Sequence, residues 1–319
     1  MFHVGAISLP FAPQEATLQL LSVCRLHSPT HSLTHSLTLL THSRTHLFTR
    51  DTLTHFTQIE IIMDFIPPTE KELQEVETLK QLIQEISQKS QTNKTETETE
   101  TETETVQEAT KNEEEITSEL IDELTNVTYL RFYRGRKHIM NDAKQSLINH
   151  LKWRKGNNVG NYESFDIKNE VESKKSFIQG TDKKGHPVVY VFARRHDKYN
   201  RDVDEITRFI IHTISTALKQ SVPTEEQIII VFDLTNFGLS CMDYEAVKIL
   251  ISILAHNYPE ILATVHIVNH PWLFNACWAV IRPWIDPVTA EKVNFTSVAD
   301  LPKFIEPENI PEDLGNYDN

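Results

Sequence analysis

Residues 228–268 read IIIVFDLTNFGLSCMDYEAVKILISILAHNYPEILATVHIV and predict two strands joined by a helix. The runs at 228–232 and 264–268 are apolar almost throughout, which is typical of strands in a sheet that helices cover. The segment between them, 244–257, has apolar residues at helical spacing: Val247, Leu250, Ile251 and Leu254. A strand, a helix and a second strand in this order favour a parallel pair with a helical crossover.

The same pattern extends on both sides of this unit. Residues 188–192 and 293–295 predict further strands, and residues 204–220 predict another helix. A turn rich in Gly, Asp and Pro at 180–187 precedes the first strand. Upstream, the apolar spacing predicts one helical stretch from Leu120 to Tyr133 and a second helix over 142–155. We therefore expect an α/β fold, with a small N-terminal helical unit followed by a mainly parallel sheet and its helices.

Three zones divide the chain. Residues 1–63 are rich in Thr, Ser and His, and we expect a disordered or even non-native extension before a natural start at Met63. Residues 64–115 predict an acidic leader, with a helix over about 70–88 capped by Thr69 and a disordered linker at the Thr-Glu repeat 95–105. Residues 116–319 predict the folded domain, divided into a helical unit at 116–158 and an α/β part at 159–319.

The net charge of −14 comes from the leader. Residues 64–125 hold 18 acidic and 5 basic residues, a balance of −13, whereas residues 126–319 hold 24 acidic and 23 basic residues, a balance of −1. The clearest basic cluster is small: Arg131, Arg134, Arg136 and Lys137. A nucleic-acid-binding surface would be more strongly basic, so we expect no nucleic-acid partner.

The sequence gives little indication of a metal site or of a membrane-spanning helix. The three cysteines, Cys24, Cys241 and Cys277, have no metal-ligand spacing, and the His-Ser-Leu-Thr repeat near residue 31 has no acidic or thiol partner that would complete a site. No apolar run reaches the roughly 18 residues that a spanning helix needs. We expect an intracellular, reduced chain that holds no metal.

Catalytic motifs are incomplete in the folded domain. The segment 238–242, GLSCM, lacks the second glycine of a nucleophile elbow, and Cys277 with Arg282 has the wrong spacing for a phosphatase loop. The segment 180–187 has two glycines at P-loop spacing but has His and Pro where Lys and Ser or Thr are required. These departures argue against an enzyme that uses nucleotides or a cysteine or serine nucleophile.

Several segments together resemble a known family. They are LRFYRGRK at 130–137, HLKWR at 150–154, the turn at 180–187, FDL at 232–234, NYPE at 257–260, NHP at 269–271 and IDPVTAEK at 285–292. In this order and spacing they resemble the CRAL-TRIO lipid-binding family, and most of all its phosphatidylinositol transfer branch. The resemblance covers about residues 120–317 and implies an α/β fold with a hydrophobic lipid pocket.

The resemblance implies four headgroup-binding residues: Arg136, Glu260, Thr289 and Lys292. The chemistry fits, because a phosphodiester calls for cationic and hydroxyl donors and a carboxylate accepts hydrogen bonds from inositol hydroxyls. We also expect Glu260 and Lys292 to pair with each other when the site is empty. From the residues alone, Arg136 could be a solvated charge or could face an anionic membrane. Glu260 could be a helix-start residue, Thr289 a helix cap and Lys292 a surface charge beside a strand.

The resemblance also implies a gate over the pocket between Trp272 and Trp284. Phe274, Trp278, Ile281 and Ile285 fall on one helical stripe, which in an unknown protein is most often core. The gate and pocket residues implied are Trp272, Phe274, Trp278, Ile281 and Trp284. The bound molecule expected is one phospholipid, phosphatidylinositol, with no other cofactor.

The identity of the second lipid and the activity of the protein each have alternatives. Ile228, Ile229 and Ile230 stand where family members that carry phosphatidylcholine have hydroxyl residues, so we expect a less polar second lipid, such as a sterol, or another phospholipid. Besides a transfer protein, the sequence allows a non-transferring lipid sensor or scaffold, and a lipid-active enzyme that would use Asp233, His266 and His270. We favour a non-enzymatic, monomeric, cytoplasmic carrier that meets membrane surfaces peripherally and transiently.

Overall fold

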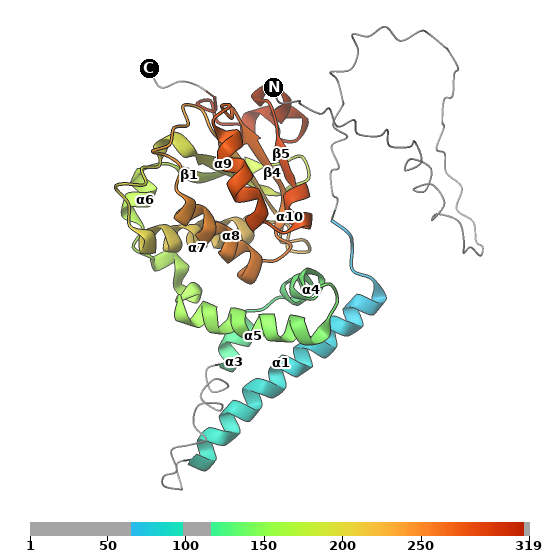
Figure 1. Cartoon of the computed structure of the whole chain (residues 1–319). Coiled ribbons are helices and arrows are strands. Elements are labelled where there is room, and N and C mark those ends of the chain that lie inside the picture. Colours follow the sequence, from blue (N-terminus) through green and yellow to red (C-terminus); the bar gives the residue numbers. More distant parts are fainter. Residues whose placement is uncertain (1–64, 98–115, 316–319) are drawn as a thin grey trace, which may run out of the picture. The chain divides into compact units, whose positions relative to one another are not determined.

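The α/β part of the chain is built on a five-stranded sheet (Figure 1), in a computed structural model that describes residues 65–97 and 116–315. The strand order is β1-β2-β3-β4-β5. β1 pairs antiparallel with β2, and the remaining neighbours pair parallel. The strands are Ser176–Thr181, Pro187–Phe192, Ile228–Asp233, Leu262–Val268 and Val293–Phe295. The expected mixed α/β fold with a mainly parallel sheet is confirmed.

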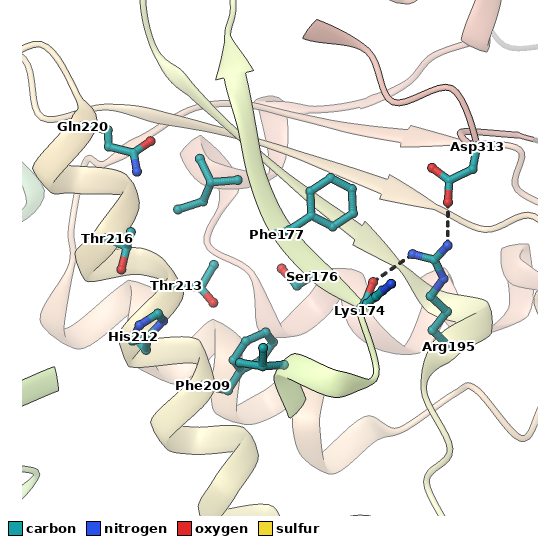
Figure 2. A pocket seen from close by; sticks show the side chains of 12 residues that line it. Lys174, Ser176, Phe177, Arg195, Phe209, His212, Thr213, Thr216, Gln220 and Asp313 are labelled. Carbon is teal, nitrogen blue, oxygen red and sulfur yellow. Dashed lines mark hydrogen bonds and ion pairs between the residues drawn. The ribbon is translucent and has the colours of Figure 1, made fainter. Parts of the chain in front are cut away.

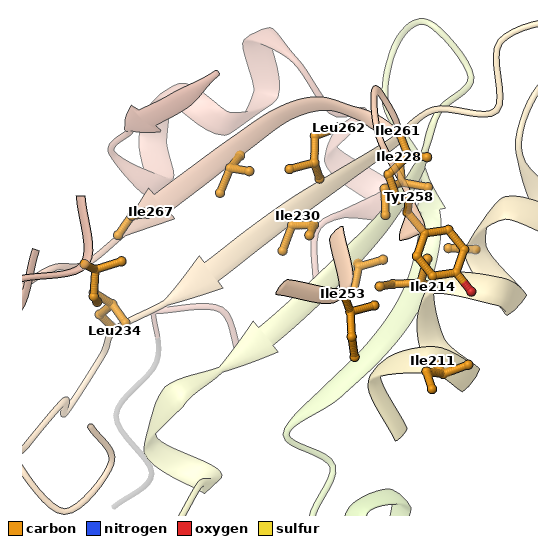
Figure 3. Close-up of a cluster of buried hydrophobic side chains, with 14 of the residues drawn as sticks. Ile211, Ile214, Ile228, Ile230, Leu234, Ile253, Tyr258, Ile261, Leu262 and Ile267 are labelled. Carbon is orange, nitrogen blue, oxygen red and sulfur yellow. The ribbon is translucent and has the colours of Figure 1, made fainter. Parts of the chain in front are cut away.

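Helices cover one face of this sheet. α7 (Val203–Gln220), α8 (Tyr244–Asn257) and α9 (Phe274–Ile281) contribute to a single hydrophobic cluster with the strands. Ile228 and Ile230 of β3 belong to this cluster, as Figure 3 shows. Burial of this face explains why α7 and α8 follow the predicted apolar spacing closely.

The opposite face carries a second apolar cluster. Val188 and Tyr190 of β2 and Ile229 and Val231 of β3 pack here against Leu301 and neighbouring residues. These neighbours come from η4 (Val298–Lys303) and the C-terminal segment. Because β3 is covered on both faces, its run of isoleucines is continuous rather than alternating.

A helical unit packs around its own core. It comprises α1 (Glu70–Thr97), α3 (Ser118–Asp122), α4 (Asn126–Gly135) and α5 (Met140–Gly156), and Leu79 and Ile83 of α1 share a cluster with Phe132 and Leu147. α1 begins with a capping box, in which the Glu72 N–H donates to Thr69 Oγ1 (3.2 Å) and the Thr69 N–H donates to Glu72 Oε2 (2.8 Å). α1 belongs to the predicted leader, yet it packs with the helices that follow it. The predicted domain boundary at residue 116 stays a prediction.

Three local predictions differ from the structure. The stretch from Leu120 to Tyr133 forms two helices, because Thr125 caps α4 by accepting the Thr128 N–H (3.0 Å). α1 runs to Thr97, so residues 95–97 of the predicted linker are helical. β1 was not predicted as a strand. The extension at 1–63, which includes the histidine repeat, and the rest of the predicted linker at 98–105 lie outside the described residues.

Shorter elements complete the chain: η1 (Val159–Ser164), α6 (Lys168–Glu172), η2 (Ala193–Arg195), η3 (Arg282–Trp284), α10 (Pro287–Glu291) and η5 (Pro307–Asn309). Within residues 65–97 and 116–315, no helix has the length and apolar character that a membrane crossing requires.

Candidate functional site

Two of the predicted site residues form an ion pair at one edge of the sheet. Glu260 lies just before β4 and Lys292 immediately before β5, and these strands are parallel neighbours. Both loops therefore lie at the end of the sheet where β4 and β5 begin, and Lys292 Nζ lies 3.5 Å from Glu260 Oε2. The Lys292 side chain is 9% exposed and the Glu260 side chain is 38% exposed. The predicted pairing of these residues is confirmed.

The backbone around Lys292 is firmly held. The Lys292 carbonyl accepts hydrogen bonds from the Val265 N–H (2.9 Å) and from Thr264 Oγ1 (3.2 Å). One turn earlier, the Lys292 N–H donates to the Thr289 carbonyl (3.1 Å), which places the predicted hydroxyl and cation on a single turn of α10. The Thr289 side chain is half-buried.

Asp286 begins this turn as its N-cap. Its Oδ1 accepts the Thr289 N–H at 2.9 Å. Burial opposes ionisation of this carboxyl, but hydrogen bonds from Thr289 outweigh it and hold the pKa of Asp286 below its ordinary value. An ionised cap fixes the short helix that carries Thr289 and Lys292.

Arg136 reaches the same region from the end of α4. A Cβ at Gly135 would lie 2.8 Å from Pro259 Cβ, closer than real atoms allow, so only glycine permits this approach. Arg136 is the C-cap of α4, and its Nε donates to Ser146 Oγ (2.6 Å) on α5. The structure thus brings the helix end next to the loop that carries Glu260.

Arg131 fastens α4 to this loop. Its Nη1 donates to the Pro259 carbonyl (3.2 Å), and its Nη2 lies 2.7 Å from Glu226 Oε2 in a largely buried ion pair. The basic cluster in the sequence therefore separates in space. Arg134 pairs with Glu72 of α1 (2.7 Å), whereas Arg131 and the Gly135–Arg136 end of α4 lie at the Pro259–Glu260 loop.

The loop before Glu260 is also anchored from α5. His150 Nδ1 lies 3.3 Å from Asn257 Oδ1, and its ring stacks on Trp153 and meets Tyr258 edge-on. Burial lowers the pKa of His150 to about 3, so the neutral imidazole donates to the Asn257 oxygen. Glu260 itself has a φ of 63°, a left-handed conformation that is strained for a residue with a Cβ.

The predicted gate residues split between core and surface. Phe274 and Ile281 of α9 are each 6% exposed and belong to the cluster over the sheet, and Trp278 is partly buried against it. Trp272 is 83% exposed and precedes α9. Trp284 packs against α8, with Lys248 Nζ 4.7 Å from its ring centre and the Tyr244 ring at 5.7 Å.

The residues suspected for an enzyme have structural partners. Asp233 is fully buried and pairs with Arg194 (2.6 Å). His266 is 1% exposed, its Nδ1 lies 2.8 Å from Thr296 Oγ1, and burial lowers its pKa to about 4. His270 packs against Phe295. Over the part of the chain that the structure describes, no group of three or more metal-ligating side chains comes together.

Sequence reasoning missed the residues that assemble the site. Ser146 and Gly135 hold Arg136 and the Glu260 loop in place, and Arg131 was noted only as part of a basic cluster. The glycine between two arginines was the one available signal. A separate cavity of about 690 Å³ lies along β1 and α7 and contains none of the predicted site residues (Figure 2).

Known proteins resemble this chain over its C-terminal part. Residues 171–315 match the CRAL/TRIO domain family. Phosphatidylinositol transfer protein CSR1 of Eremothecium gossypii is 36% identical over 59% of this chain and 46% of its own length. A CRAL-TRIO domain-containing protein of Schizosaccharomyces pombe, C3H8.02, is 34% identical over 58% of this chain and 44% of its own length. The chain thus spans about half the length of these relatives.

A solved structure shares the fold. The crystal structure of Sfh5 superimposes with a TM-score of 0.55 and covers 76% of this chain and 84% of its own, at 20% sequence identity. This likeness concerns the arrangement of helices and strands.

Proposed function

We propose that this chain, which carries a CRAL/TRIO domain over residues 171–315, binds one phosphatidylinositol molecule and transfers it between membranes. The observation that carries the proposal is the convergence of Lys292, Glu260 and the end of α4 at one sheet edge. The likeness to a phosphatidylinositol transfer protein at 36% identity supports it.

The headgroup is held by charge and hydrogen bonds. Lys292 and Arg136 bind the phosphodiester, Thr289 donates its hydroxyl, and Glu260 accepts from inositol hydroxyls. The ion pair between Glu260 and Lys292 supports this assignment. A bound phosphate replaces the Glu260 carboxylate as the partner of the Lys292 ammonium, and the carboxylate then accepts hydrogen bonds from the inositol hydroxyls. The lysine is thereby neutralised in both states.

The acyl chains lie between the sheet and the helices that cover it. About 30 methylene groups, at about 0.8 kcal/mol each, would cost roughly 24 kcal/mol if they were exposed to water. The apolar cluster formed by β3, α7, α8 and α9 supplies a surface of the required kind. Admission of the chains requires α9 to move away from the sheet, so α9 with its flanking residues acts as the gate.

The strand chemistry supports a less polar second cargo. Ile228 and Ile230 face the cluster on the helix-covered side of β3 and offer no hydrogen bond to a choline phosphate. We therefore propose a sterol or another phospholipid as the alternate ligand. The carrier associates with membranes peripherally and transiently.

Mass spectrometry of lipids extracted from the purified chain tests the ligand. Phosphatidylinositol is expected as the main phospholipid. A preparation dominated by phosphatidylcholine would overturn the ligand assignment. A vesicle-to-vesicle transfer assay then tests the activity, because a lipid sensor would bind phosphatidylinositol without moving it.

A further inference from the structure

β1 is an edge strand whose outer side is open. Among the described strands it pairs only with β2. The Phe192 N–H donates to the Lys175 carbonyl (2.7 Å), which establishes which residues of β1 direct their backbone groups toward β2. In an antiparallel pair, successive residues point their backbone groups alternately toward the partner and away from it. The N–H and C=O groups of Ser176 and Ile178 are therefore directed away from β2.

The cavity of about 690 Å³ runs along this open side (Figure 2). β1 contributes Ser176, Phe177 and Ile178. α7 contributes one face along its length: Phe209, His212, Thr213, Thr216 and Gln220. The eleven steps from Phe209 to Gln220 rise by about 16 Å along the helix, and about five extended residues span the same length at roughly 3.3 Å each. The groove thus has the length of a short strand.

Both apolar and polar groups line the groove. Val171 lines it with 53% of its surface exposed, and Phe177 and Ile178 are only partly buried. The hydroxyls of Thr213 and Thr216 have no hydrogen-bond partner among the described side chains and backbone. An acyl chain would leave these hydroxyls and the free strand groups unsatisfied, whereas a peptide backbone can bond them.

The two ends of the groove differ. At the Lys174 end, Arg195 is neutralised by Asp313 (2.5 Å), whereas exposed Lys174 has no ion-pair partner in residues 65–97 or 116–315. At the other end, Asn309 Nδ2 donates to the Thr181 carbonyl (2.9 Å) and lies against Gly180. The open stretch of β1 is therefore limited to residues 176–179, and Lys174, among the described residues that line the groove, carries a positive charge without an ion-pair partner.

We propose that this groove binds an extended peptide segment of a partner protein, which adds to β1 as a sixth strand. An antiparallel peptide places its C-terminal side beside Lys174, so the fitting segment carries a carboxylate there and apolar side chains toward Val171 and Phe209. Main-chain bonds to Ser176 and Ile178 supply affinity, and the Lys174 ammonium sets the direction of the bound strand.

Peptide selection on the full chain tests the proposal. A phage-displayed library of random octapeptides is selected against the purified protein, and the best peptide is synthesised as the probe. We expect apolar residues at alternate positions and an acidic residue on the C-terminal side. Amide exchange measured by NMR should show new protection at Ser176 and Ile178, and little change at Phe177, whose N–H already faces β2.

Two variants block the groove in different ways. Ile178→Pro removes an outward N–H without removing a bond to β2, and Thr216→Arg fills the groove from α7. Each is expected to weaken probe binding at least 10-fold, whereas Gln145→Arg on the exposed face of α5 leaves binding unchanged. If Ile178→Pro unfolds the chain, Thr216→Arg alone decides.

Three results would overturn the proposal: failure to select any binding peptide, binding insensitive to Thr216→Arg, or protection elsewhere than β1. The same holds if phosphatidylinositol vesicles, rather than peptides, protect Ser176 and Ile178. Phosphatidylinositol transfer by Thr216→Arg should equal that of the unmodified chain, so this test and that of the proposed function fail independently.

Discussion

Lys292 Nζ lies 3.5 Å from Glu260 Oε2. Lys292 immediately precedes β5 and Glu260 lies just before β4, and these two strands are parallel neighbours. Because both strands are held in the sheet, the spacing of the cation and the carboxylate follows from the fold. The lysine side chain is nearly buried, whereas the carboxylate remains more open to water. The fold therefore holds the lysine ammonium in position at this end of the sheet.

Gly135→Ala tests the contact that brings α4 to this site. The added Cβ would lie 2.8 Å from Pro259 Cβ, so the helix or the loop must shift. We expect a loss of about 1–3 kcal/mol in the free energy of unfolding, as for other overpacked sites, measured by urea denaturation. Gly156→Ala is the control, since a Cβ there meets nothing within 4 Å. Equal stability of the two variants would contradict the tight contact.

Glu226→Gln tests the buried pair that fastens α4 to the Pro259 loop. The change leaves the Arg131 guanidinium, whose side chain is 8% exposed, without its carboxylate. Loss of one member of a buried pair costs about 3 kcal/mol or more, which chemical denaturation will measure. Lys219→Met breaks the exposed pair with Glu163 and should leave stability unchanged. A cost for Glu226→Gln below about 1 kcal/mol would argue against a structural role.

His186 predicts a pH dependence of stability on the alkaline side. Its Nδ1 lies 2.9 Å from Asp182 Oδ2 and its Nε2 lies 3.0 Å from Glu225 Oε2. Burial opposes protonation, but the two carboxylates outweigh it and raise the pKa of His186 above 6.5. The folded state thus holds the proton more tightly than the unfolded state, and this stabilisation is lost as the pH rises from 6.5 through the folded pKa.

His186→Gln removes this proton and keeps hydrogen-bonding capacity. Urea denaturation between pH 6 and pH 9 should show a fall in the stability of the unmodified chain that is smaller in the variant. Parallel pH curves for the two proteins would show that the histidine is not protonated between its carboxylates.

Phe274 and Trp272 should respond differently to truncation. Phe274→Ala removes a core side chain that is 6% exposed, and we expect a loss of about 3–5 kcal/mol in the free energy of unfolding. Trp272→Ala removes a side chain that is 83% exposed, and we expect a change within about 0.5 kcal/mol. Thermal and urea denaturation distinguish these outcomes. A strong destabilisation by Trp272→Ala would mean that this ring packs against the protein.

The parts of the fold with continuous apolar runs could be predicted from the sequence. β2, β3 and β4 lie between other strands of the sheet, so their burial is visible as apolar sequence. β1 is an edge strand with only Phe177 and Ile178 as large apolar residues, and it carries no comparable signal. The break between α3 and α4 was missed because Leu120 and Leu124 continue the helical spacing across it, and no Gly or Pro marks the boundary.

The candidate site could be predicted only where a motif carried it. Glu260 and Lys292 stand in recognisable segments, and their pairing followed from opposite charge. The contacts of Gly135 with Pro259 and of Arg136 with Ser146 join separate elements, and no local pattern reports such contacts. Likewise, the apolar stripe of α9 did not reveal that Trp272 lies outside the core.

In the proposed function, Lys292 and Glu260 hold the headgroup of a transferred lipid. The most direct test is phosphatidylinositol transfer between vesicles by Lys292→Ala and Glu260→Ala, with Lys183→Ala on the exposed β1–β2 turn as the control. Circular dichroism confirms that each variant is folded. We expect transfer to fall at least 10-fold in the two site variants and to be unchanged in the control. Transfer at the unmodified rate by folded Lys292→Ala and Glu260→Ala would contradict the site assignment.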